Sequence, residues 1–215
     1  MHIPPSDLIN ILHETSHAIL STHSTQLPGF PFGTAVPLVT DEYHRPILLI
    51  SALAEHTKNL RADSRASIAI IESGKDNVQD AKRATLVGHF HEFEPSTALV
   101  NRYLRYQPDA ERYLQLDFSF YRLAVENIRY IGGIGQMGWL EASRLDESLS
   151  LKPTDENELL SSLCSGLPER FRILGLDSHG IDYLADGFRG RLRFEKPLNG
   201  DQLETALPDL LRRLN

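Results

Sequence analysis

The sequence predicts a mainly β protein with helices, an α+β fold in which a small closed barrel precedes a smaller α+β unit. Roughly six short apolar segments are separated by turn residues, and most have no helix between them, which favours antiparallel pairing over a parallel α/β sheet. Helix-forming runs interrupt this series at only a few places, which suits a small barrel. Around residues 148–155 the composition becomes polar and predicts a linker.

The chain is expected to start with a helix and two strands. Two prolines followed by Ser6 and Asp7 predict a helix start, because either side chain can accept hydrogen bonds from the first free N–H groups. Residues 18–22 predict the first strand, and residues 34–39 the second. Pro37 cannot donate to a strand ladder, so we expect a bulge or a sheet edge there.

The other elements of the first part follow the same rules. A polar turn at residues 41–45 before an apolar run at 47–50 predicts a hairpin. Runs bounded by turn residues predict further strands, and helix formers after a turn or a proline predict helices. The expected strands are residues 66–71, 84–93, 118–125 and 127–131, and the expected helices are residues 52–61, a helix opened by Pro95, and a shorter one from Pro108 through Leu114.

The last part of the chain predicts a small second domain. We divide the chain into a barrel domain, residues 1–147, and an α+β domain, residues 148–215. A domain of roughly 60 residues buries little core, so we expect it to lean on the barrel. Its expected elements are a helix at residues 158–163, a strand at 171–176, a turn at 177–180, a hairpin through 189–194 and a helix at 203–214.

Composition excludes several classes of protein. The 215 residues carry a formal net charge of −7, which argues against a nucleic-acid coat or a polybasic membrane surface. Cys164 is the only cysteine, so we expect neither an intramolecular disulfide nor a cysteine-based zinc site, and a reduced, cytoplasmic compartment is the default. Residues 1–12 lack the apolar core of a signal peptide, and no apolar run reaches the ~20 residues of a membrane helix.

Several motifs, in unbroken order between residues 5 and 142, resemble one known family. They are PFGTAVP at residues 31–37, SALAEHTKNL at 51–60, RATLVG at 83–88, RYIGGIG at 129–135 and GWL at 138–140. The string at residues 51–60 is the most specific of them. Together these motifs resemble the haem-iron-utilisation proteins, a branch of the pyridoxamine-5'-phosphate-oxidase-like, FMN-binding split-barrel superfamily. The resemblance implies a split β-barrel followed by a small α+β domain of haem-utilisation type.

The resemblance also implies a homodimer with two small-molecule sites at the subunit interface. In flavin-binding relatives the phosphate is held after the third strand and at the start of the next helix, a position that falls here on residues 51–58. A helix start attracts anions, and arginines on adjacent strands can add charge-assisted bonds. The same groups suit the propionates of haem, so FMN and haem both stay open as cofactors. The implied cofactor-binding residues are Ser51, His56, Thr57, Lys58, Arg65 and Arg83.

The chain departs from that family at two places. Relatives open the second domain with a sequence that contains a histidine, whereas residues 155–159 contain none, and His179 is the only histidine after His91. In haem-degrading members a histidine near the C-terminus binds the iron, so His179 is the candidate ligand, and an exposed turn residue is the alternative. Trp139 is not followed by the arginine-leucine-histidine motif of true pyridoxamine-phosphate oxidases, which disfavours vitamin B6 oxidation.

Two further groups of histidines have spacings that suit a metal ion. His89 and His91 alternate on an expected strand and therefore point to one face, but no third ligand is near them in the sequence. His13 and His17 are four residues apart at the end of a helix, where a plain structural role is favoured. The glycines at residues 132–135 follow no βαβ unit, so they predict a tight turn rather than a nucleotide-binding loop.

The sequence leaves three functions open. The first is haem utilisation with oxygen-dependent haem degradation, in which bound iron would activate oxygen against the porphyrin. The second is an FMN-dependent oxidoreductase whose phosphate is held by residues 51–58. The third is a non-catalytic protein that binds or stores haem, which the missing histidine favours.

Overall fold

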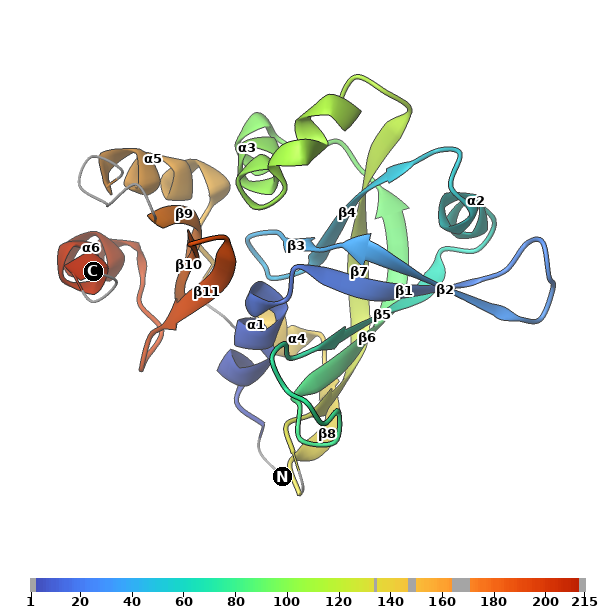
Figure 1. Cartoon of the computed structure of the whole chain (residues 1–215), viewed down its shortest axis with the longest axis horizontal. Coiled ribbons are helices and arrows are strands. Elements are labelled where there is room, and N and C mark those ends of the chain that lie inside the picture. The colour runs from blue at the N-terminus through green and yellow to red at the C-terminus, as the bar shows by residue number, and fades with distance from the viewer. Residues whose placement is uncertain (1–2, 134, 147–149, 164–170, 213–215) are drawn as a thin grey trace.

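Two antiparallel sheets form the framework of the molecule (Figure 1). The computed structural model describes residues 3–133, 135–146, 150–163 and 171–212. An eight-stranded sheet curls into a half barrel, and a three-stranded sheet follows it in the chain. This arrangement of many antiparallel strands with several helices agrees with the predicted fold class.

The large sheet has the order β2-β1-β5-β6-β7-β4-β3, with β8 also paired to β7. β2 lies at an edge, as the proline at its end predicts, and β3 with β4 forms the predicted hairpin. β8 was not predicted from the sequence. The strands are β1 (His17–His23), β2 (Pro31–Pro37), β3 (Val39–Thr40), β4 (Pro46–Ser51), β5 (Arg65–Ile71), β6 (Arg83–Glu92), β7 (Phe118–Ile131) and β8 (Met137–Glu141).

The long strand β7 holds the barrel together. Its start pairs with β4, its end pairs with β8, and residues 121–131 pair with β6. The sequence predicted two strands that separate at Glu126, and the structure corrects this to one continuous strand with a bulge at that residue. Val87 pairs with Asn127, and Gly88 pairs with Val125, so Glu126 is the extra residue.

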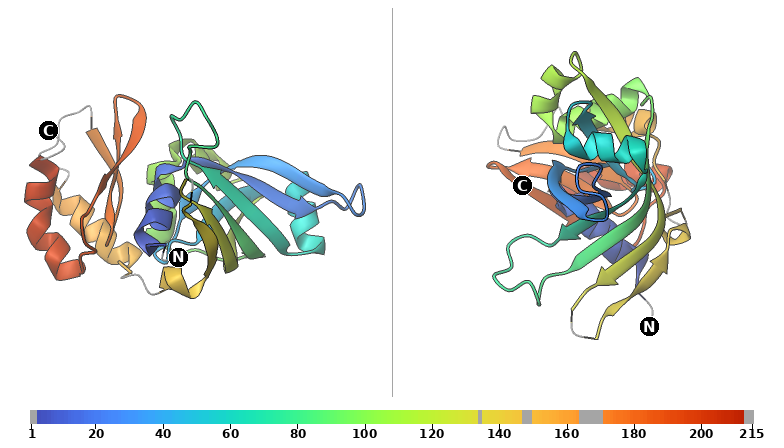
Figure 2. Two further views of the ribbon diagram at one scale, coloured as in Figure 1. Left: turned by 90° about the horizontal axis from the view of Figure 1, so that it is seen from below. Right: turned by 90° about the vertical axis from the view of Figure 1, so that its right-hand side faces the viewer.

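The barrel core is an apolar cluster closed by the first helix, α1 (Pro5–Glu14). Leu8 and Leu12 of α1 pack against inward residues of the strands, such as Ile68 and Leu86, and all four are almost fully buried. The N-cap of α1 is a proline without a side-chain hydrogen bond, so the predicted caps Ser6 and Asp7 are wrong. Seen from below, α1 lies between the barrel and the small sheet (Figure 2).

The other helices of the barrel start and end close to their predicted positions. α2 begins at Glu55 rather than at residue 52, because residues 52–54 form a turn after β4. The shorter helix after Pro108 is a 3₁₀ helix, and the short helix α4 was not predicted. The helices are α2 (Glu55–Ala62), α3 (Thr97–Tyr106), the 3₁₀ helix (Pro108–Tyr113) and α4 (Ser143–Asp146).

The C-terminal unit has its own sheet and its own apolar core. The helices α5 and α6 cover the face of the small sheet that is turned away from the barrel (Figure 2). α5 begins inside the expected linker, and the boundary at residues 147 and 148 stays a prediction. The elements are α5 (Pro153–Leu163), β9 (Phe171–Asp177), β10 (Gly180–Ala185), β11 (Phe188–Arg193) and α6 (Gly200–Arg212). Among the residues described, no helix has both the length and the apolar character that crossing a bilayer requires.

Candidate functional site

The outer face of the large sheet contains two hollows. Alternate residues of β1, β5 and β6 point into the barrel core, and the residues between them point outward. The larger hollow, hollow A, has a volume of about 420 Å³ and the smaller one, hollow B, about 270 Å³. Hollow A is lined by Ser21, Thr22, His23, Pro31, Arg65, Ala66, Ser67, Val87, Gly88, His89 and Glu126. Hollow B is lined by Ile19, Ala69, Ile70, Ile71, Arg83, Ala84, Thr85, Arg129 and Ile131.

His89 is the best-positioned imidazole of hollow A. Its Nδ1 is 2.8 Å from the Ser64 hydroxyl oxygen, and its Nε2 is 3.5 Å from a carboxylate oxygen of Glu126. The ring of His91 stacks parallel to it, with 6.0 Å between ring centroids. The predicted common face of these two histidines is therefore correct, and the bulge in β7 supplies the neighbouring carboxylate. The described residues show no third metal ligand beside the pair.

The two arginines implied by the resemblance do not meet within one chain. Arg65 pairs with His89 at one end of the β5–β6 ladder and Arg83 pairs with Ile71 at the other, roughly 20 Å away at about 3.3 Å per residue. Arg65 also binds the carboxylate of Asp63 at 2.5 and 2.9 Å and holds the pKa of that acid below its usual range. Each arginine therefore belongs to a different hollow.

Residues 51–58 are all described, and none of them lines either hollow. The hydroxyl of Ser51 donates to Asp117 at 3.2 Å and accepts from the N–H of Leu53, so the expected phosphate-binding hydroxyl is already paired with a carboxylate. Thr57 is fully buried and Lys58 is exposed. Burial lowers the pKa of the half-buried His56. Residues 51–58 therefore offer an anion fewer free hydrogen-bond donors than the resemblance implies.

The most specific motif has a structural role. The buried side chain of Asn59 accepts hydrogen bonds from the N–H and the hydroxyl of Thr25, at 2.8 and 2.9 Å. It donates to the hydroxyl of Thr22 at 3.0 Å. These contacts tie α2 to the end of β1, beside hollow A. The motif therefore holds in place the end of the strand that lines hollow A, although none of its own residues lines the hollow.

His179 does not lie in an exposed turn. It follows β9 and is 6% exposed, and its ring packs edge-on against His44 with 5.8 Å between centroids. Burial lowers the pKa of the His179 imidazole. It lines neither hollow, so its role as a haem-iron ligand stays a prediction without geometric support.

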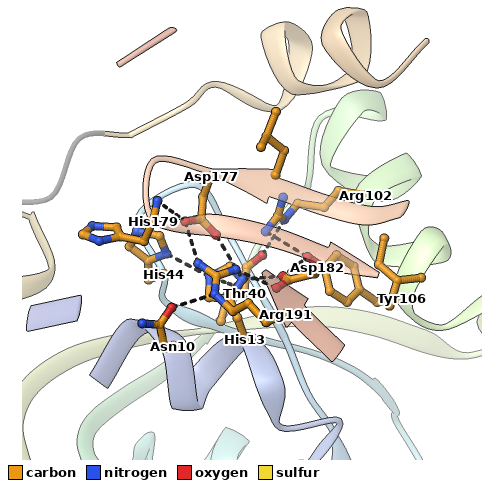
Figure 3. A network of polar contacts seen from close by, with 12 residues as sticks. Asn10, His13, Thr40, His44, Arg102, Tyr106, Asp177, His179, Asp182 and Arg191 are labelled. Atoms are coloured by element: carbon orange, nitrogen blue, oxygen red, sulfur yellow. Dashed lines mark hydrogen bonds and ion pairs between the residues drawn. The ribbon is translucent and has the colours of Figure 1, made fainter. Parts of the chain in front are cut away.

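A buried polar network joins the barrel to the small sheet around His179 (Figure 3). Its centre is Asp182 of β10, whose carboxylate binds His13 of α1 at 2.7 Å, Tyr106 of α3 at 2.5 Å and Arg191 of β11 at 2.6 Å. Arg191 also binds Asp177 at 2.8 Å. Burial raises the pKa of the Tyr106 phenol, which therefore keeps its proton and donates a hydrogen bond to Asp182.

The same network links two histidines and leaves two buried polar atoms without a hydrogen bond. Because a carboxylate only accepts, the Nδ1 of His13 donates a hydrogen bond to Asp182. The Nε2 of His13 shares a hydrogen bond with the Nδ1 of His44, at 2.9 Å. The Nε2 of His44 and the carboxylate Oδ2 of Asp177 are buried without a hydrogen bond, and this Oδ2 lies 3.3 Å from the Nδ1 of His13. Burial lowers the pKa of His44, although Asp177 opposes this shift.

A second part of the network pairs Arg102 of α3 with Glu156 of α5. Both side chains are almost fully buried. Glu156 also binds Arg105 at 2.8 Å and accepts from the N–H of Leu176 at 2.8 Å. Burial disfavours the charged form of Arg102, but the attraction of Glu156 outweighs this effect, so the pKa of the guanidinium is raised.

Sequence reasoning missed several of these residues. His23 is the last residue of β1, and its side chain points outward into hollow A. The predicted strand ended one residue earlier, and extending it by one residue would have placed His23 on the outer face by alternation. His13 is buried in the network, whereas His17 is exposed on β1, so the two do not form a pair. His44 joins His13 through folding across 31 positions of the chain, which no local pattern reveals.

Residues 10–146 match the family model described as "CREG, beta-barrel". In a search of curated proteins, the noncanonical chloroplastic heme oxygenase HOZ of Arabidopsis thaliana is 32% identical over 133 residues. The match covers 61% of this chain and 41% of the relative, so the chain spans about two fifths of that protein's length.

Solved structures resemble nearly the whole chain. A protein of unknown function from Agrobacterium tumefaciens superposes with a TM-score of 0.73 at 24% identity, over 95% of this chain and 94% of its own. A heme binding protein from Mycobacterium smegmatis superposes with a TM-score of 0.63 at 24% identity, over 99% of this chain and 98% of its own. At this identity the likeness concerns the fold, and it confirms the predicted split barrel with a small α+β unit.

Proposed function

Because the chain belongs to the family of the CREG β-barrel, we propose that it binds haem on the outer face of the large sheet and takes part in haem utilisation. The similarity to a heme oxygenase and to a heme binding protein supports this function. The observation that carries it is hollow A, which combines an apolar floor with two imidazoles and a guanidinium. FMN stays open as the alternative cofactor.

The lining of hollow A fits the chemistry of haem. The flat porphyrin needs apolar surface, which Ala66, Val87 and Gly88 provide. Iron needs a neutral imidazole nitrogen, and His23 and His89 both line the hollow, where the Nε2 of His89 would exchange its contact with Glu126 for the iron. The propionates need cations, and Arg65 can exchange its bond to Asp63 for one to a carboxylate of the ligand. Bound haem would supply oxygen activation, and the chain would hold and orient it.

The outer face also supports the expected homodimer. Four large apolar side chains on it are 41–64% exposed, which is unusual for a sheet that faces only water. The register places them on one continuous surface around hollow B, and hollow A lies farther along the same strands. Two copies packed across this face would enclose both hollows. The four residues are Ile19, Ile71, Met137 and Trp139.

We expect the apo-protein to bind haemin in a saturable way, with a shifted Soret band in an absorption titration. Replacing both His23 and His89 by alanine is expected to weaken binding at least tenfold and to change the band position, since both imidazoles of hollow A are lost. The matched control is His17→Ala, which removes an exposed histidine from the same strand outside the hollow.

The same titration tests the alternatives. Loss of the Soret shift in His179→Ala, with an unchanged double variant, would move the iron to the buried network and contradict hollow A as the site. Saturable FMN binding without any haem response would favour the flavin oxidoreductase. Haem binding without product formation under oxygen and a reductant would favour storage. These outcomes distinguish haem degradation, haem storage and flavin-dependent oxidation from one another.

We expect a dimer at micromolar concentration by light scattering after gel filtration. Ile19→Glu is expected to weaken the dimer more than tenfold, because it buries an unpaired carboxylate at an apolar interface. The control Phe188→Glu changes an even more exposed apolar residue on β11, in the small sheet, and should remain dimeric. A monomeric wild-type protein would show that the two-copy site is wrong.

A further inference from the structure

We propose that His13, His44 and Asp177 bind one divalent transition-metal ion, of the chemical class of Zn²⁺, at the junction of the barrel and the small sheet. The three side chains come from α1, from the β3–β4 turn and from the end of β9. All three are buried, and one ligand atom of each lies within 4.8 Å of the other two. This site is separate from the haem-binding face, because none of the three residues lines hollow A or hollow B.

The spacing of the nitrogens is close to that of ligands on one ion. Two ligands of a tetrahedral zinc ion with bonds of about 2.0–2.1 Å are about 3.3 Å apart. The Nε2 of His13 is 2.9 Å from the Nδ1 of His44 and 3.2 Å from the hydroxyl oxygen of Thr40. A small outward movement of the two rings would admit an ion in place of the proton between them. Thr40 Oγ1 or a water would complete the coordination.

A carboxylate already orients the first histidine from behind. Metal-binding histidines usually donate their other N–H to a carboxylate, which fixes the ring and makes the ligand nitrogen more basic. Asp182 accepts from the Nδ1 of His13 at 2.7 Å and so directs its Nε2 lone pair at the site. Tyr106 and Arg191 in turn hold Asp182 in place.

An unsatisfied oxygen and the local charge point to a cation. Arg191 binds the Oδ1 of Asp177, while the buried Oδ2 has no hydrogen bond and only a 3.3 Å ion-pair contact with the Nδ1 of His13, so a metal would give this oxygen a stronger partner. Asp177 and Asp182 carry two negative charges and Arg191 carries one positive charge, so these three side chains together have a net charge of −1, and Arg189 also interacts with Asp182. Two nitrogens and one carboxylate oxygen suit zinc, cobalt or nickel better than calcium or magnesium.

His44 occupies a position that a side chain seldom adopts without a reason. Its φ of 59° lies in the left-handed region, which favours glycine or asparagine in a hairpin turn. The turn places the imidazole inside the protein instead of in water, with 1% exposure. A ligand role explains why a histidine rather than a glycine stands there. A bound ion would join the barrel to the small sheet, since Asp177 alone comes from that sheet.

The test uses the full chain, stripped with a chelator and free of haem, titrated with Co²⁺ alone. We expect one equivalent per chain and visible d–d bands of a tetrahedral or five-coordinate site, with Zn²⁺ displacing the Co²⁺. His44→Gln is expected to weaken binding at least tenfold and to abolish the rise in Tm that Zn²⁺ gives the wild type. The control His17→Gln removes an exposed histidine and should bind as the wild type does.

Asp177→Asn provides a second variant if His44→Gln does not fold by circular dichroism. It keeps the size of the side chain and removes its charge, and it should also weaken binding at least tenfold. Absence of a saturable Co²⁺ spectrum from the wild type would overturn the proposal. Equal affinity of the wild type and a folded variant would overturn it as well. Because no haem is present, neither result bears on the haem-binding function.

Discussion

Glu156→Ala is expected to lower the free energy of unfolding by about 3–5 kcal/mol, because it leaves the buried charge of Arg102 without a partner. It also removes the acceptor of the buried N–H of Leu176 and the partner of Arg105. For a chain of this size ~1 kcal/mol corresponds to about 2–4 °C in Tm, so thermal unfolding should shift by about 6–20 °C. Urea unfolding followed by circular dichroism measures the effect.

Two further variants decide whether the cost comes from the unpaired charge. Glu158→Ala removes an exposed acid from the same helix and should change stability by less than about 0.5 kcal/mol. The double change Arg102→Met with Glu156→Leu replaces the pair by apolar groups of similar volume and should recover most of the loss. A double variant as unstable as the single one would place the cost in packing and in the lost hydrogen bond to Leu176 rather than in the unpaired charge.

Local patterns predicted the elements of the fold because each element depends on nearby residues. Prolines, turn residues and alternation located α1, the hairpins and most strands within a few positions. Glu126 shows the limit of such patterns. The sequence predicted that one strand ends before this residue and another begins after it. In the structure, hydrogen bonds to β6 on both sides keep the strand continuous through a bulge.

The candidate site was less predictable because it depends on distant residues. The resemblance correctly directed attention to the barrel, but the arginines it implied lie at opposite ends of the β5–β6 ladder. Hollow A instead combines the end of β1, the start of β5 and the bulge of β7. The buried network joins α1 to β10 across 169 positions, a separation that only tertiary packing determines. His179 lies in the predicted turn, but this turn is buried by tertiary packing instead of exposed to water.

Gly88→Ala is expected to destabilise the protein by about 1–3 kcal/mol, the usual cost of forcing extra volume into a packed region. A Cβ atom at this position would be 2.0 Å from the backbone oxygen of Ala124, so β6 and β7 would have to move apart at the bulge. The nearest atoms belong to the backbone of Ala124 and Val125, which cannot rotate away as a flexible side chain can. Urea unfolding of the variant against the wild type measures the loss.

The control is Gly33→Ala on the edge strand β2, where the nearest atom to an added Cβ is a side-chain methyl of Ile19 at 3.8 Å. This variant should be neutral or slightly more stable, because alanine restricts the unfolded chain. Val87, His89 and Glu126 flank the bulge and line hollow A, so we also expect Gly88→Ala, unlike Gly33→Ala, to weaken haem binding several-fold. Haem binding by Gly88→Ala at wild-type affinity, despite the lost stability, would mean that the bulge shapes the barrel but not the ligand site.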